Sequence, residues 1–595
     1  MSLFVLHPQN TFWEMIKKMD GGELIAQVLK KQGVRFLFTL CGGHISPILV
    51  GAKKQGIRVI DVRQEPTAVF AADAISRLTG IPGVAAVTAG PGVTNTITAI
   101  KNAQMAQSPL ILLGGAAATI LKGRGALQDI EQVKLFKTLV KWATTIKQDC
   151  DIIPIMEEAF EVAKSGIPGP VFVECPIDLL YEESLVRRMY GSFTGETNKN
   201  GESVMVSYLR THVDKLFACS DTKMEPSEPN KIIPFSIDDH DLSQTISYLN
   251  KSKSSIMVIG SQTMLRTDNI NYLVSAVEQI GIPVYLTGMA RGLLGDTNSL
   301  NLRHKRRDAL KEADLVILAG MSIDFRLNYG MAINSKAVLI SINRSKKALK
   351  KNRNPTLGIQ ADPSTFLVAL SKQFNNEKKI WDTWIKTLHL REFEREKVIQ
   401  KFSEVDTEYI NPLLLCKNVN EIIENDSIIV GDGGDFVATV SYIVKTKRPL
   451  SWLDPGPYGT LGVGAGFALA AKLVRPEAEV WLMWGDGAAG YGLIEFDTFV
   501  RHNIPIIAVI GNDAGWTQIS RDQIELLNDD VGTILRYNNY HTAAEAYGGK
   551  GLLLNDPKAI NDILKEAKEI ARKGDPVLVN ALIGKTDFRK GSISM

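Results

Sequence analysis

The chain has 595 residues, of which 45% are hydrophobic and 22% are charged. These proportions are typical of ordinary globular domains, and a chain of this length predicts about three domains of ~100–200 residues each. The formal net charge is only +3. Because no basic stripe with interleaved aromatic residues is present, we expect no nucleic-acid partner.

The cysteines are scattered and odd in number, and no two of them form a CxxC pair. They are Cys41, Cys150, Cys175, Cys219 and Cys416. This pattern predicts neither a disulfide framework nor a zinc site, and it favours a reducing compartment. No apolar run reaches the ~18 residues that a membrane-spanning helix needs. The first twenty residues lack the order of a signal peptide, although a short amphipathic stretch there is compatible with their pattern.

The first block of the chain, residues 21–185, alternates short apolar runs with helical patterns. The expected strands are 34–40, 56–62, 83–89, 109–115 and 169–176. Each run ends at glycine or proline before a helical period begins, which is typical of βα units. Such alternation predicts a parallel sheet covered by helices, and we place this domain at residues 20–187.

A polar, irregular segment, residues 188–232, is predicted to be a linker or insert. A second α/β block, residues 233–375, follows, with expected strands at 254–260, 282–288, 313–320 and 336–343. The basic run "RHKRR" at 303–307 is interpreted as a solvated helix face, with a phosphate or nucleotide contact as the alternative. Residues 376–403 are charged and have a helical pattern.

The third block, residues 405–585, again alternates strands and helices. Its expected strands are 427–434, 479–487, 504–513 and 575–584. The whole chain is therefore predicted to be an α/β protein with three doubly wound parallel-sheet domains.

The third block contains the most specific motif. One buried strand ends at Gly485-Asp486-Gly487, and the strand after the next helix ends at Gly511-Asn512-Asp513. Because neighbouring parallel strands end at the same edge of a sheet, Asp486 and Asn512 are expected to meet there. A carboxylate, an amide oxygen and a backbone carbonyl are the oxygen ligands that Mg²⁺ prefers. The glycines allow the backbone to approach a diphosphate at the following helix N-terminus.

This combination resembles the signature of the thiamine-diphosphate enzymes, whose pyrimidine-binding, middle and diphosphate-binding domains follow one another in this order. The resemblance implies that thiamine diphosphate and Mg²⁺ are cofactors. It implies metal ligands at Asp486, Asn512 and, through its carbonyl, Ala514. It implies cofactor contacts at Gly433, Gly434, Asp435, Gly459, Leu461, Gly485, Asp486, Gly487, Ala488 and Asn512. Leu461 is the expected apolar wedge under the cofactor. Gly511 stands where many members have asparagine.

A strand–acid–helix junction lies at "RQEPTAVFAADAISRLTG" in the first block. Taken alone, Glu65 is interpreted as a solvated acid at a helix N-terminus, where negative charge is favourable. The stretch also resembles the family motif in which a carboxylate contacts the aminopyrimidine ring, and Glu65 is the matching residue. In that family two subunits form each site, so a homodimer or homotetramer is implied.

Two further segments of the first block resemble the family's active-site channel, and a third position, His44, follows the first expected strand. One contains Pro91 and Asn95, which are expected near the cofactor, and another contains Gln128 as a catalytic candidate. His44, in the turn "CGGHISP", either faces the substrate or makes only local hydrogen bonds.

Phrases such as "GGHISP", "GMARGLLG" and "GNDAGWTQIS" resemble the acetolactate synthases and, more closely, the acetolactate-synthase-like 2-hydroxyacyl-CoA lyases of fatty acid alpha-oxidation. The resemblance implies cleavage of a 2-hydroxyacyl-CoA into formyl-CoA and an aldehyde one carbon shorter. Two alternatives stay open: a carboligase or decarboxylase acting on 2-oxo acids, and a non-catalytic scaffold or regulatory subunit.

Two features depart from these relatives. Ser322 occupies the position of an arginine that helps to hold FAD in acetolactate synthases, whereas Arg326 is kept. FAD, an ADP-like nucleotide and an empty middle-domain site are therefore all open. The related lyases are membrane-associated in the endoplasmic reticulum, which implies that location here; because this chain lacks their apolar N-terminal segment, a cytoplasmic location is the alternative.

Overall fold

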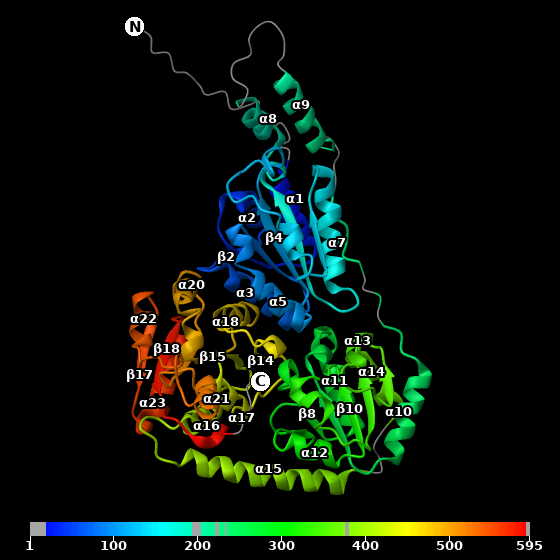
Figure 1. The fold of residues 1–595 in the computed structure, drawn as a ribbon, viewed down its shortest axis with the longest axis vertical. Helices are drawn as coiled ribbons and strands as arrows, with labels where there is room; N and C mark the ends of the chain where they lie inside the picture. Colours follow the sequence, from blue (N-terminus) through cyan, green and yellow to red (C-terminus); the bar gives the residue numbers. More distant parts are fainter. Residues whose placement is uncertain are drawn as a thin grey trace, which may run out of the picture.

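The computed structural model describes residues 19–192, 204–219, 225–230, 233, 235–374 and 380–590. Figure 1 shows three α/β units, with the N-terminal unit above and the middle and C-terminal units side by side below it. Within the described residues each unit contains one six-stranded sheet, and the strand pairings in these sheets are parallel. The predicted fold class is confirmed.

The N-terminal sheet has the strand order β2-β1-β3-β4-β6-β5. Its strands are β1 (Phe36–Leu40), β2 (Arg58–Asp61), β3 (Gly83–Val87), β4 (Leu110–Ala116), β5 (Trp142–Thr145) and β6 (Pro170–Pro176). Successive side chains of a strand point to opposite faces: Phe38 packs with α3 (Glu65–Thr79) and α5 (Ile97–Ala106). Leu37 packs with α1 (Gly21–Lys31), α2 (Ser46–Lys54) and α7 (Ile152–Lys164) on the other face.

The middle sheet has the order β12-β11-β10-β7-β8-β9. Its strands are β7 (Ser255–Ile259), β8 (Val284–Leu286), β9 (Asn301–Leu302), β10 (Leu315–Ala319), β11 (Val338–Ile342) and β12 (Leu357–Ile359). One face packs against α10 (Asp239–Lys251), α11 (Ile270–Ile280) and α14 (Pro363–Gln373). The other face packs against α12 (Arg306–Glu312). If the six strands are numbered 1 to 6 along the chain and the sheet is read from β9 to β12, the order is 3-2-1-4-5-6. This is the strand order of dinucleotide-binding folds.

The C-terminal sheet has the order β14-β13-β15-β16-β18-β17, which repeats the order of the N-terminal sheet. Its strands are β13 (Ile428–Asp432), β14 (Trp452–Leu453), β15 (Val480–Gly485), β16 (Ile507–Asn512), β17 (Lys550–Leu554) and β18 (Val577–Leu582). One face packs on α18 (Gly464–Val474), α20 (Phe496–Arg501) and α22 (Tyr540–Ala546). The opposite face packs on α16 (Pro412–Ile422), α17 (Asp435–Ile443) and α23 (Ile560–Arg572).

Helices also join the three units. Helix α3 of the N-terminal unit packs on α18 of the C-terminal unit, so their cores form one continuous cluster. Helix α15 (Asp382–Ser403) runs beneath the two lower units in Figure 1. Its Leu388 is buried in the middle core, whereas its Ile399 is buried in the C-terminal core. Within the predicted linker, residues Val204–Leu216 form helix α9, which lies beside α8 (Glu183–Ser192).

The expectation of no disulfide is wrong, because Cys150 and Cys219 form one across 69 positions. The spacing of the cysteines did not indicate this bridge, because its two ends are far apart in the sequence. Helices α8 and α9 lie between them, and Cys219 follows α9 and pairs with Cys150 just before α7. Disulfides persist in oxidising surroundings. The cysteine pattern therefore no longer favours a reducing compartment.

The described part of the chain has no helix of the length and apolarity required to cross a bilayer. The predicted amphipathic stretch at the N-terminus lies almost wholly in residues 1–18, outside the described residues. The same holds for parts of the predicted linker, residues 193–203, 220–224 and 231–232.

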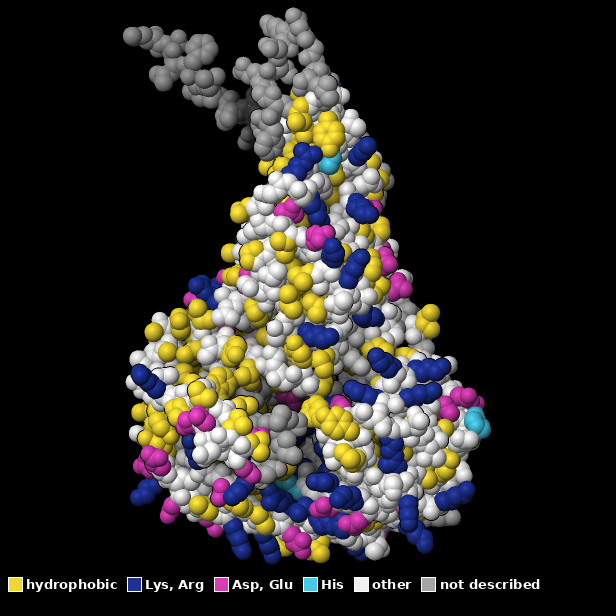
Figure 2. All heavy atoms as spheres, viewed as in Figure 1, with side chains coloured by type: hydrophobic (Ala, Val, Ile, Leu, Met, Phe, Trp, Pro, Cys, Tyr) yellow, Lys and Arg dark blue, Asp and Glu magenta, His cyan; other side chains and the backbone are white. Residues whose placement is uncertain are grey.

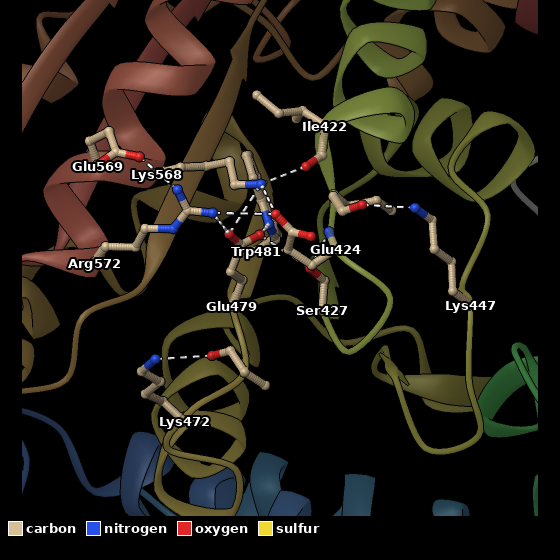
Figure 3. Close-up of polar contacts among 12 residues, drawn as sticks. Ile422, Glu424, Ser427, Lys447, Lys472, Glu479, Trp481, Lys568, Glu569 and Arg572 are labelled. Atoms are coloured by element: carbon tan, nitrogen blue, oxygen red, sulfur yellow. Dashed lines mark hydrogen bonds and ion pairs between the residues drawn. The ribbon is translucent and has the colours of Figure 1, made fainter.

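At the amino ends of β13 and β15, the C-terminal unit is held by an ion-pair cluster (Figure 3). Lys568 of α23 contacts Glu424 at 2.7 Å and Glu479 at 3.2 Å, and it also donates to the Ile422 carbonyl. Arg572 reaches both of the same carboxylates. This cluster is at the sheet edge opposite to Asp486, so we assign it a structural role.

Candidate active site

The two predicted metal ligands meet at one turn of the C-terminal sheet. Asp486 follows β15 and begins the short helix α19 (Asp486–Ala489), while Asn512 ends the neighbouring strand β16. An Asp486 carboxylate oxygen accepts from the Gly515 backbone N–H at 3.1 Å. The Asn512 amide oxygen accepts from the Ala514 N–H at 3.3 Å. Ala514 adopts a left-handed conformation, with φ of 54°.

Among the residues that the structure describes, Asp486 has no ion-pair partner. Burial raises the pKa of Asp486 to about 7, and the Asp513 carboxylate adds to the shift. Both Asp486 and Asn512 are buried, with exposed fractions of 4% and 0%. Closely spaced buried acids are stabilised by a divalent cation, and the carboxylate and amide oxygens suit Mg²⁺. The residues present therefore fit the implied metal.

The backbone around this turn has no room for additional side chains. A Cβ on Gly433, in the loop after β13, would lie 2.9 Å from the Gly485 nitrogen. A Cβ on Gly487 would lie 2.5 Å from the ring of Trp516. The loops after β13 and β15 thus approach each other backbone to backbone, as a diphosphate-binding turn requires.

The remaining C-terminal candidates lie around these loops. The Asp435 carboxylate pairs with Arg521 at 2.7 Å, and Gly434 lies beside Gln518. Ala488 is buried inside α19. Gly459 has a φ of 67° and open space around its Cα, whereas the half-buried Leu461 packs on the core cluster.

In the N-terminal unit, Glu65 and Asn95 are brought together at the carboxyl edge of the sheet. Glu65 is the first residue of α3, and its carboxylate accepts from the Asn95 side-chain amide at 3.1 Å. Pro91 begins the intervening helix α4 (Pro91–Thr94). The side chain of Glu65 is half-buried rather than solvated.

His44 and Gln128 lie at the same edge. The His44 Nδ1 is 3.2 Å from the Thr88 hydroxyl, and burial lowers the pKa of the imidazole. Gln128 has a φ of 63°, and its backbone packs against Gly90. Three loops of the N-terminal sheet therefore converge near Glu65.

Sequence reasoning missed Asp432, the last residue of β13. Its fully buried carboxylate accepts from the backbone N–H groups of Gly462 and Gly464, at 3.1 and 2.8 Å, and from the Trp484 indole at 3.1 Å. Burial raises the pKa of Asp432 to about 6. This acid fixes the loop that contains Leu461 to the carboxyl end of β13, and the sequence "GDGG" was the available signal.

A cavity of about 940 Å³ lies between the middle and C-terminal units. Figure 2 shows Lys and Arg side chains around this hollow. Its lining contains two aspartates and the cationic residues Arg291, Arg303, Lys305, Arg306, Arg307, Arg326, Arg395 and Lys445. Thus the run 303–307 is not a solvated helix face, because α12 begins only at Arg306 and His304 is buried.

Several cavity cations are only partly paired: Arg291 and Arg303 each donate to a backbone carbonyl, and Arg303 also lies 3.9 Å from the Glu396 carboxylate. Burial lowers the pKa of Arg291, Arg303 and Arg306. Among the described residues, Arg291 Nε, Arg303 Nη1 and His304 Nδ1 have no hydrogen-bond partner. Buried donors and charges are costly unless they are paired, so the chemistry of this cavity suits a polyanion.

The three units match three consecutive family descriptions. Residues 19–135 match "Thiamine pyrophosphate enzyme, N-terminal TPP binding domain", residues 242–370 match the central domain, and residues 432–581 match the C-terminal TPP binding domain. The chain therefore belongs to the thiamine pyrophosphate enzymes, thiamine pyrophosphate being another name for thiamine diphosphate.

Several relatives are similar to this chain over nearly its whole length, and their names describe two kinds of enzyme. The chain is 48% identical to 2-hydroxyacyl-CoA lyase 2 of Danio rerio, over 97% of this chain and 93% of that protein. It is 45% identical to 2-hydroxyacyl-CoA lyase 2 of Homo sapiens, over 99% and 95%. It is 32% identical to the acetolactate synthase large subunit of Mycobacterium tuberculosis, over 95% and 96%.

Proposed function

We propose that this enzyme cleaves 2-hydroxyacyl-CoA into formyl-CoA and an aldehyde one carbon shorter. The observation that carries the proposal is the identity of 45–48% to 2-hydroxyacyl-CoA lyases 2 along nearly the whole chain. The bond between the thioester carbonyl carbon and the hydroxyl-bearing carbon breaks. The hydroxyl carbon leaves as the aldehyde, and the carbonyl carbon gains a proton to become the formyl group.

Bound thiamine diphosphate supplies the nucleophilic carbon and the electron sink for this cleavage. The proposed metal is Mg²⁺, held by Asp486, Asn512 and the Ala514 carbonyl. The loops at 433–435 and 485–488 would bind the diphosphate through their backbone N–H groups and the adjoining helix N-termini.

Glu65 is proposed to hold a proton at the aminopyrimidine ring. Asn95, which donates to one carboxylate oxygen of Glu65, orients this group. His44 is proposed to face the substrate as a neutral imidazole, since its pKa is lowered. Gln128 is proposed to line the channel.

Glu65 and Asp486 lie at the edges of different sheets. We therefore propose a homodimer or homotetramer in which the Glu65 edge of one subunit completes the Asp486 edge of another. The basic cavity is proposed as the site of an FAD or ADP-like nucleotide, because its lining contains eight Lys and Arg side chains but only two aspartates. We also propose an endoplasmic-reticulum location, which the disulfide supports if that part of the protein faces the oxidising lumen.

The test is to incubate purified protein with thiamine diphosphate and Mg²⁺ and to offer 2-hydroxyacyl-CoA and pyruvate separately. Formyl-CoA and a shortened aldehyde that are lost in Glu65→Gln would support the lyase. Acetolactate from pyruvate alone would favour a synthase, which the 32% relatives make the second candidate. Failure to bind thiamine diphosphate would contradict the whole assignment.

A further inference from the structure

Glu495 of the C-terminal unit contacts the loop that presents Glu65. It ends the 3-10 turn η10 (Leu493–Glu495), and its side chain is buried, with an exposed fraction of 1%. Both carboxylate oxygens accept from the backbone N–H of Arg63, each at 3.1 Å. The backbone N–H of Gln64 and the hydroxyl of Thr67 also donate to it. The donors therefore flank Glu65 on both sides.

These contacts lie at the entry to a helix that has no side-chain cap. Helix α3 begins at Glu65, and its N-cap residue, Gln64, makes no side-chain cap hydrogen bond. The first N–H groups of a helix need external acceptors. Glu495 supplies such an acceptor for the turn that leads into α3, and Thr498 donates to the same carboxylate at 2.5 Å.

A second set of contacts fixes the same loop from the strand side. Arg501 pairs with the Asp61 carboxylate at 2.6 Å, and His502 Nε2 lies 2.9 Å from its other oxygen. Asp61 ends β2, four positions before Glu65. Because residues 495–502 lie between Asp486 and Asn512 in the chain, one segment connects the proposed metal turn to the Glu65 loop.

We propose that Glu495 is a positioning residue that holds Glu65 in its working geometry. It acts through its neighbours rather than on the reacting atoms: it binds the backbone before the acid and the Thr67 side chain after it. The inference rests on the proposed role of Glu65 toward thiamine diphosphate, but not on the identity of the acyl substrate.

The test uses Glu495→Ala in the full-length protein loaded with thiamine diphosphate and Mg²⁺. The main readout is deuterium exchange at C2 of the bound cofactor, which needs no acyl substrate. A displacement of about 1 Å in a reacting group can cost ~100-fold in rate, so exchange should fall by about 10- to 100-fold. Glu495→Gln keeps one acceptor oxygen and should give an intermediate rate.

A second readout is independent of the cofactor. In the ligand-free protein, backbone amides at residues 63–70 should exchange faster in Glu495→Ala than in the parent. The matched control is Glu424→Gln, a carboxylate at the opposite sheet edge (Figure 3), which should leave both readouts unchanged. If Glu495→Ala does not fold, Thr67→Val removes one donor within the N-terminal unit and should give the same changes at smaller amplitude.

The outcomes separate this inference from the proposed function. Unchanged C2 exchange or unchanged amide protection in folded Glu495→Ala would overturn the positioning role. A purely structural residue would lower the melting temperature and the cofactor affinity while leaving C2 exchange in the loaded enzyme intact. If the parent protein accelerates C2 exchange but cleaves no 2-hydroxyacyl-CoA, the substrate assignment fails and the role of Glu495 stands. If the parent accelerates no exchange, both fail.

Discussion

A buried ion pair inside α3 gives a stability prediction that can be worked out from the structure. Arg77 and Asp73 form two hydrogen bonds, of 2.8 and 2.6 Å, and their side chains are 2% and 0% exposed. Asn102 adds a third bond to Asp73 at 3.1 Å. Arg77 also donates to the Asp454 carbonyl, at 2.8 Å, and thereby joins α3 to the loop before Gly459.

Asp73→Ala should leave the Arg77 charge buried without its partner, which typically costs about 3–5 kcal/mol of unfolding free energy. For a unit of ~150–250 residues, each 1 kcal/mol lowers the melting temperature by roughly 2–4 °C. We therefore expect the transition that reports on the N-terminal unit to fall by roughly 6–20 °C. Differential scanning calorimetry, with amide exchange to assign the transition, measures this shift.

The double variant Asp73→Ala/Arg77→Met removes the charge as well as its partner. It should be no less stable than Asp73→Ala alone, because no unpaired ion is left in the core. Glu131→Ala, which breaks an exposed pair with Lys134, should not change the transition measurably. The reasoning is refuted if Asp73→Ala costs less than about 1 kcal/mol, or if the two core substitutions are simply additive.

Three further outcomes are expected. Cys150→Ser removes a disulfide that closes a loop of 69 positions, so it should lower the unfolding free energy by about 4 kcal/mol. Chemical denaturation should show this loss, and adding a reductant to the parent protein should reproduce it. Asp432 has a pKa of about 6 instead of 3.8, so the folded state binds a proton that the unfolded state releases between these values. The unfolding free energy should therefore fall by about 3 kcal/mol as pH rises from ~4 to ~6, and Asp432→Asn should remove that slope. Gly511→Ala would place a Cβ 2.4 Å from the Phe436 ring and should cost about 1–3 kcal/mol, measured as a lower melting temperature.

Each of these has a contrary result. Equal unfolding free energies for the reduced and the oxidised parent protein would contradict the prediction for Cys150→Ser. An unchanged pH slope in Asp432→Asn would show that other groups cause it. Tolerance of alanine at 511 would mean that crowding by Phe436 does not explain why glycine replaces the family's asparagine.

The sequence predicts the interior strands well and the edge strands poorly. Interior strands are buried on both faces and show as continuous apolar runs, such as Leu110–Ala116. The strands that were not predicted, β5, β9, β12, β14 and β17, all lie at sheet edges. They are short, and β5, for example, is only half-buried with the sequence "WATT". An edge strand packs less surface, so its sequence needs less apolar character.

The candidate site likewise has features that could be predicted from the sequence and features that could not. Asp486 and Asn512 could be placed together because parallel strands share an edge, and the structure brings them to one turn. Their role as metal ligands stays a prediction. The basic cavity and the contact between Glu495 and the Glu65 loop could not be predicted, because they depend on how separate units pack. No local periodicity records such packing.

Helix α15 connects the middle and C-terminal units along one side of the cavity between them. Its 22 residues span roughly 33 Å at 1.5 Å per residue. Near its centre, Glu392 accepts from the backbone of Arg303 at 3.1 Å, while Leu388 and Ile399 are each buried in a different core. One continuous helix is thus anchored in both cores and spans the gap between the two units. A ligand in the basic cavity would therefore lie between two walls that the same helix joins, so the length of α15 bears on the size of ligand that the cavity accepts.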